Sequence, residues 1–226
     1  MLFCLCNLSI NNPAYAYGNK WTEKKLGKII VKADRASRKK QWDRAVSYGE
    51  KVLEGSLALD QKSDQRYINL LKNLNVYYDH SNRPNRDPSR IKEAYILSKM
   101  HLGPTHKTTF TSRNLLYKKY ISQKKYREAI PLARENIQYN PKRTDSEFRE
   151  YYYLTQLYSL YGLTEQFDKE EDTLKHMIDI ARDIFGEEDE EYKKTILNLA
   201  KNYCRQKKYT PFTKLTKEHN LKYICN

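Results

Sequence analysis

The sequence predicts an all-α protein, built as an α-solenoid of about five antiparallel helix pairs. Glycine and proline are scarce, with seven of each in 226 residues. Helix-forming Lys, Glu and Leu, together with 20 tyrosines, instead fill long stretches of the chain. A sequence pattern also recurs at intervals of 41 or 42 residues, and such a period is typical of stacked helix pairs.

The pattern is clearest in two segments that share the tetrapeptide QKKY. Residues 114–130 read NLLYKKYISQKKYREAI, and residues 198–212 read NLAKNYCRQKKYTPF. Their offset is 83 residues, about twice 41.5, which predicts a further copy between them. Leu157, Tyr161 and Phe167 supply that copy, with the same Leu-x3-Tyr-x5-aromatic spacing.

Two earlier copies complete the array. Leu74 and Tyr78 repeat the Leu-x3-Tyr pair, followed by a longer gap, HSNRPNRDPS, whose prolines and polar residues predict a loop. A more degenerate first copy places Trp42 at the aromatic position and Ala45 three residues later. The predicted units span about residues 22–56, 62–101, 105–140, 144–185 and 188–224, and we assign residues 17–226 to one solenoid domain.

Each predicted unit is a helix pair that has to stack on its neighbours. Leu and Tyr four residues apart share one helix face. A small residue near the start of the second helix (Ala45, Ala94 or Ala129) allows the two helices to approach closely. Because such a pair is apolar on both sides, it can bury its surface only in an array of units.

The residues of the third unit carry a family resemblance. LGPTHKTTFTSRNLLYKKYISQKKYREAIPLARENI resembles the tetratricopeptide repeat (TPR), in the roughly 42-residue variety found in kinesin light chains. The resemblance covers about residues 22–224 and implies a right-handed superhelix. The chain departs from the family pattern in three ways. Lysines replace the turn glycine, Glu170 and Phe212 occupy positions of small residues, and a proline lies within a predicted helix; the other residues concerned are Lys124, Lys207 and Pro131.

The resemblance also implies a ligand groove, lined by the first helix of each unit. Positions two before and two after the signature leucine face this groove in the family, as does the neighbouring asparagine. Carried over to this chain, the groove residues are Lys72, Asn73, Val76, Asn114, Lys118, Thr155, Ser159, Leu197, Asn198 and Lys201. Asn and Lys side chains can hold the backbone and carboxylates of an extended peptide. We therefore expect a protein or peptide partner that carries acidic groups, although ordinary solvated helix faces would have the same composition.

The N-terminus predicts export. An apolar stretch from Leu2 to Ile10 precedes Ala14-Tyr15-Ala16, which has the small-x-small form of a cleavage site, so residues 1–16 are a candidate signal peptide. No basic residue precedes Leu2, so either the true start lies upstream or the signal is weak. The expected location is a bacterial periplasm; the alternatives are a cytoplasmic protein and an N-terminal tail that is disordered or caps the core.

Cleavage after Ala16 would leave only Cys204 and Cys225. An even number of cysteines in an exported protein favours a disulfide. A single helix over residues 209–224, however, would carry Cys225 about 20 Å away from Cys204. The sequence thus favours two free thiols, unless the helix breaks near His219-Asn220.

No motif in the sequence predicts catalysis, a cofactor or a metal site. The five histidines lack metal-ligand spacing, and His101 and His106 flank a predicted turn at Gly103-Pro104. HExxH, GxSxG, Walker and CxxC motifs do not occur. The acidic run at 187–191 is explained by the start of a helix, where negative charge is favourable. We therefore expect a non-enzymatic scaffold.

The charge distribution supports alternatives of a different class. The chain has a formal net charge of +14, yet residues 163–191 contain 12 acidic and 3 basic residues, net −9, which leaves +23 elsewhere. The basic charge is consistent with nucleic-acid binding, but packing uses most of the tyrosines that base stacking would need, so we do not expect that partner. Further alternatives are a regulatory subunit of a separately encoded enzyme and self-association through the solenoid ends. No transmembrane span is expected.

Overall fold

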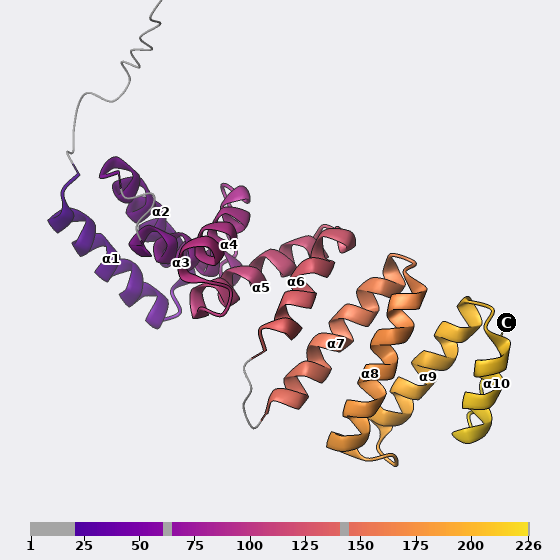
Figure 1. The fold of residues 1–226 in the computed structure, drawn as a ribbon. Helices are drawn as coiled ribbons and strands as arrows, with labels where there is room; N and C mark the ends of the chain where they lie inside the picture. The colour runs from indigo at the N-terminus through magenta and orange to yellow at the C-terminus, as the bar shows by residue number, and fades with distance from the viewer. Residues whose placement is uncertain (1–20, 61–64, 141–144, 226) are drawn as a thin grey trace, which may run out of the picture.

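The computed structural model describes residues 21–60, 65–140 and 145–225, and this part of the chain forms ten α-helices arranged as five antiparallel pairs (Figure 1). None of these helices is long and apolar enough to cross a membrane. The pairs are α1 (Glu23–Arg38) with α2 (Trp42–Ala58), α3 (Gln65–His80) with α4 (Ser89–Leu102), α5 (Lys107–Ser122) with α6 (Tyr126–Gln138), α7 (Ser146–Leu163) with α8 (Phe167–Phe185), and α9 (Glu190–Arg205) with α10 (Tyr209–Glu218).

The turn inside a pair has the same geometry in four of the five units. The residue two before the second helix has a left-handed backbone, with φ between 55° and 59°, at Lys40, Lys124, Glu165 and Lys207. In each turn the next amide donates back into the first helix, as Lys125 N does to the Tyr120 carbonyl at 2.9 Å. This is the Schellman geometry that glycine favours. Lysine or glutamate therefore adopts the conformation of the missing family glycine.

The stacking of units follows from the signature leucine. Leu116 of α5 packs with Tyr95 of the preceding α4. Leu157 of α7 belongs to the same core cluster as Ala129 of α6, and Leu199 of α9 to the same cluster as Leu174 of α8. In the described residues the core is therefore a row of four clusters along the array rather than a single central cluster, and each unit buries its apolar surface against its neighbours.

A buried arginine joins three helices in the middle of the array. Arg113 of α5 is 1% exposed; its Nε donates to Asn136 Oδ1 at 2.6 Å, and its Nη1 lies 3.5 Å from Glu135 Oε2. Glu135 of α6 also accepts hydrogen bonds from Tyr95 and Lys99 of α4. These charge-assisted bonds fix how α4, α5 and α6 sit against one another. Sequence analysis did not identify Arg113, because it occupies no signature position.

The C-terminal segment corrects one expectation. Helix α10 ends at Glu218, and a left-handed residue, Asn220 with φ 48°, reverses the chain. Cys225 returns to α9 and forms a disulfide with Cys204, with their Cα atoms 5.4 Å apart. The expectation of one helix over 209–224 with two free thiols was therefore wrong, since the helix breaks at the predicted weak point.

The returning segment also explains an unusual residue in α10. Phe212 occupies a position where the family has a small residue. Its ring lies edge-on to Tyr223 of the returning segment, 6.2 Å between ring centroids. Phe212 also packs against the core cluster of α7, α8 and α9, so the large side chain joins the returning segment to that core.

Candidate peptide-binding groove

The first helices of neighbouring units lie side by side and form one surface of the solenoid. Between α3 and α5, Thr108 Oγ1 donates to Asn69 Oδ1 at 2.8 Å, and Lys118 pairs with Asp79 at 2.9 Å. Between α7 and α9, Asn198 Nδ2 donates to Tyr158 Oη at 3.3 Å. Direct polar contacts therefore join the first helices of units two and three and of units four and five.

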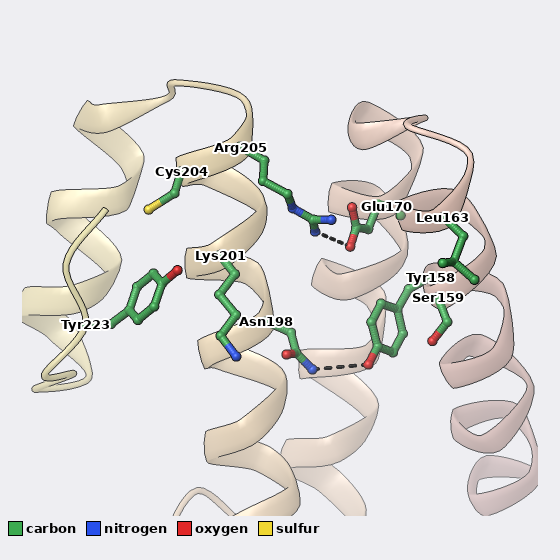
Figure 2. A pocket seen from close by; sticks show the side chains of 10 residues that line it. Tyr158, Ser159, Leu163, Glu170, Asn198, Lys201, Cys204, Arg205 and Tyr223 are labelled. Atoms are coloured by element: carbon green, nitrogen blue, oxygen red, sulfur yellow. Dashed lines mark hydrogen bonds and ion pairs between the residues drawn. The ribbon is translucent and has the colours of Figure 1, made fainter. Parts of the chain in front are cut away.

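A cavity of about 590 Å³ opens between α7 and α9 (Figure 2). The returning C-terminal segment closes one side of it with Tyr223, and α8 contributes Glu170. The other lining residues are Tyr158, Ser159, Gly162 and Leu163 of α7, and Asn198, Lys201, Cys204 and Arg205 of α9. Three of the predicted groove residues, Ser159, Asn198 and Lys201, thus meet at one cavity.

These three residues can offer different interactions to a ligand. Ser159 Oγ donates to the Thr155 carbonyl at 2.9 Å, so its lone pairs can still accept. Asn198 uses one amide hydrogen on Tyr158 and keeps another donor. Lys201 is exposed and makes no hydrogen bond or ion pair with any described residue. Among the charged groups that line the cavity, its ammonium group is therefore the one available to bind a ligand.

The wall beside Lys201 is an ion pair between the buried Glu170, which is 3% exposed, and Arg205 (Figure 2). Glu170 also accepts a hydrogen bond from Asn202 Nδ2 at 3.0 Å. Glu170 fits at a small-residue position because the residue opposite is Gly162, where an added Cβ would lie 3.0 Å from Glu170 Oε1. The glycine provides the space, and Arg205, which is committed to Glu170, is not a free cation for a ligand.

A second carboxylate on α8 ties the last two units together. Glu171 accepts hydrogen bonds from Lys175 at 2.7 Å and from Gln206 and Lys208 at 2.8 Å. Burial by itself would raise the pKa of Glu171, but these three donors outweigh it and lower the pKa to about 2. Glu171 is thus ionised at neutral pH and joins α8 to the turn before α10.

The predicted groove residues of α3 lie away from this cavity. Lys72 is half-buried, and its Nζ donates a hydrogen bond to Asn73 Oδ1. Part of the hydrogen-bonding capacity of both side chains is therefore already used. Burial, and then the nearby charge of Lys107, lower the pKa of Lys72. Val76 is also half-buried. The surface formed by α3 therefore offers a ligand fewer free hydrogen-bond donors than expected from the sequence.

The predicted groove residues of α5, and Thr155 of α7, also have hydrogen-bond or ion-pair partners within the chain. Asn114 accepts a hydrogen bond from Asn136 at 3.1 Å, which links it to the Arg113 cluster. Lys118 is 64% exposed but pairs with Asp79. The hydroxyl of Thr155 donates to the Tyr151 carbonyl at 2.9 Å. Of the predicted lysines, Lys201 alone is exposed and has no partner among the residues that the structure describes.

Sequence analysis missed an apolar stripe on α7. Phe148, Tyr152 and Leu163 are 54%, 60% and 59% exposed. They share a helix face with the predicted residues Thr155 and Ser159, because all five recur at intervals of three or four. That spacing was a usable signal in the sequence. The stripe gives the surface around the cavity an apolar component next to its lysine.

Within the described residues, no three His, Cys, Asp or Glu side chains come together as metal ligands. His106 has a structural role, since its Nδ1 accepts from the Thr108 amide at 3.2 Å and caps α5.

Comparisons with known proteins identify the fold. No protein-family model and no curated protein matches the chain. Two structures of nearly identical TPR-like repeats, assigned to a kinesin light chain of Podosopora anserina, align with TM-scores of 0.58 and 0.59 at 15% identity, and cover 87% of this chain and 93% of theirs. BtubC (BKLC) of P. vanneervenii aligns with a TM-score of 0.52 at 16% identity over 86% of this chain and 78% of its own. The predicted TPR-like α-solenoid is thereby confirmed as a fold.

Proposed function

We propose, from the premise that this chain is a TPR-like helical-repeat protein, that it is a non-enzymatic scaffold whose first helices bind a peptide or protein segment. The cavity between α7 and α9 carries this proposal. It combines the ammonium group of Lys201, which has no partner among the described residues, the hydrogen-bonding side chains of Asn198 and Ser159, and the exposed Leu163 of the apolar stripe. This combination suits a segment that carries a carboxylate beside an apolar residue.

The proposal predicts where a partner touches the chain. A photo-crosslinking residue at Ser159 should capture a protein from the native cell, whereas the same residue at Arg134, exposed on α6, should not. Lys201→Glu should lower the Ser159 crosslink at least tenfold, because a carboxylate then repels the ligand. The matched control Lys217→Glu changes an exposed lysine outside the cavity by the same charge and should have no effect. Equal crosslinking from Ser159 and Arg134 would contradict the groove assignment.

We also propose that the protein is exported. The Cys204–Cys225 disulfide supports this, because disulfides persist in oxidising compartments. The predicted cleavage site at Ala16 lies outside the described residues. The intact mass of the protein isolated from its own cells tests the proposal: a chain that begins at Tyr17 and carries the disulfide supports export, and a chain that retains residue 1 with reduced cysteines contradicts it.

Self-association through the solenoid ends stays a prediction. Two apolar side chains at the C-terminal end, Tyr209 and Ile224, are 58% and 79% exposed and support that end as the one that would associate. At the N-terminal end, the outward face of α1 is charged.

A further inference from the structure

The outward face of α1 is strongly basic. Six cations lie within an arc of about 120° at 100° per residue and extend over about 22 Å at 1.5 Å per residue. They are Lys24, Lys28, Lys32, Arg35, Arg38 and Lys39, and all six are exposed. The same arc contains no Asp or Glu, and Val31, 57% exposed, is its apolar member.

Nothing in the described part of the chain neutralises this face. None of the six cations takes part in an ion pair there. The two carboxylates of α1 lie elsewhere: Glu23 pairs with Arg66, and Asp34 faces Lys72 and Tyr77 of α3. We call these six cations with Val31 the α1 basic face.

Two members of the α1 basic face, Lys28 and Lys32, occupy positions that are buried in the later units. Lys28 and Lys32 lie 12 and 8 residues before the left-handed turn residue Lys40. The residues 12 and 8 before the equivalent turn residues are Ser112 and Leu116 in α5, Tyr153 and Leu157 in α7, and Thr195 and Leu199 in α9, and all six are buried. In α1 this face has no preceding helix to cover it among the described residues.

The first unit of a solenoid needs a polar outer face for solubility, but it does not need a face of one sign. Mixed charges or neutral polar residues would serve equally well. A single-signed face without counter-charges is instead suited to an anionic partner. Because the cations stand along one helix side rather than around a cavity, an extended anionic surface can meet all of them, whereas a small anion would reach two or three.

We propose that the α1 basic face docks the N-terminal end of the solenoid on an anionic lipid surface. Two observations favour lipid over nucleic acid. The face has no aromatic side chain on which a base could stack, and its exposed Val31 suits the headgroup boundary. Residues 1–22, immediately upstream, contain no acidic residue that would oppose a negative surface. This surface is separate from the cavity between α7 and α9, so both can be occupied at once.

The test is flotation with vesicles, carried out on the full chain and on the chain that begins at Tyr17. Binding is expected to vesicles that contain about one third phosphatidylglycerol, not to pure phosphatidylcholine, and to weaken with salt. Lys28→Gln with Lys32→Gln and Arg35→Gln should lower the partition constant about 100-fold, at about fivefold per cation. The matched control, Arg127→Gln with Arg134→Gln and Lys217→Gln, removes the same three charges from exposed sites elsewhere and should lower it far less.

Three outcomes would overturn the proposal. The first is an equal loss in the two triple variants, because net charge alone would then explain binding. The second is full binding by the α1 variant together with lost binding by Leu5→Asp with Leu8→Asp, which would assign binding to the apolar N-terminal stretch. The third is no vesicle binding but a duplex DNA mobility shift that the α1 variant abolishes, which would make nucleic acid the partner. Circular dichroism of each variant verifies the fold.

Discussion

Helix α1 at the N-terminal end packs Leu26, Ala33 and Ala36 into the array, whereas α10 at the other end has no buried residue among its ten. The N-terminal unit is therefore held by side-chain packing, with cations on its outer face. The C-terminal unit has a covalent link in addition to the packing of α9, since the Cys204–Cys225 disulfide ties the returning segment to α9. A solenoid can thus close its two ends by different means.

The largest expected effect is the loss of this link. Cys204→Ser with Cys225→Ser opens a loop that spans 21 residues and should destabilise the last unit by about 3 kcal/mol. Hydrogen exchange should accelerate in α10 and in residues 219–225. Amides of α1 serve as the internal control and should keep their rates. Unchanged protection of α10 would show that packing, not the disulfide, holds it.

Acid should also act first on the C-terminal end. The folded pKa of Glu171, about 2, lies below its ordinary value of 4.5, so its contribution to stability is present above pH 4.5 and is lost as the pH falls toward 2. Glu171→Gln should cost up to about 3 kcal/mol at pH 7 and nothing near pH 2. Urea unfolding at both pH values measures this. A constant difference between variant and parent would contradict the mechanism.

The smallest expected effect is a gain in stability from glycine in the turn of the first or the last unit, and it should be equal in the two turns. Lys40→Gly and Lys207→Gly each relieve a left-handed backbone, with φ of 55° and 57°. Each should stabilise the protein by about 0.5–1 kcal/mol, since the relief exceeds the added chain entropy of glycine. Lys39→Gly is the matched control, because Lys39 has an ordinary φ of −83° and should gain nothing. The melting temperature of each variant tests whether the two turns are equivalent.

The repeat made the helices predictable from sequence. Trp42, Tyr126, Phe167 and Tyr209 each begin a helix, as the aromatic position of the pattern indicated. Such local patterns specify a solenoid well because each unit contacts only its neighbours.

Features that depend on pairs of distant residues were not predictable in this way. Glu170 is understood only with Gly162, which provides its space, and the Cys204–Cys225 pairing only with the chain reversal at Asn220. The candidate site contains residues of both kinds, those that were predictable from the sequence and those that were not. Lys201 and Asn198 were expected from the family resemblance, whereas Tyr223 reaches the cavity through the disulfide and was not predicted.

The closed C-terminal end also gives the chain a direction of unfolding. In a one-dimensional array, loss of structure starts at an end and spreads inward, because an end unit has one neighbour rather than two. The disulfide fastens the returning segment to α9 within the last unit, and Glu170 and Glu171 of α8 bind Arg205 and Lys208 of that unit, so fraying from that side has to break these contacts. We therefore expect spontaneous opening and proteolysis to begin at α1, and contact of α1 with a surface to protect the whole array.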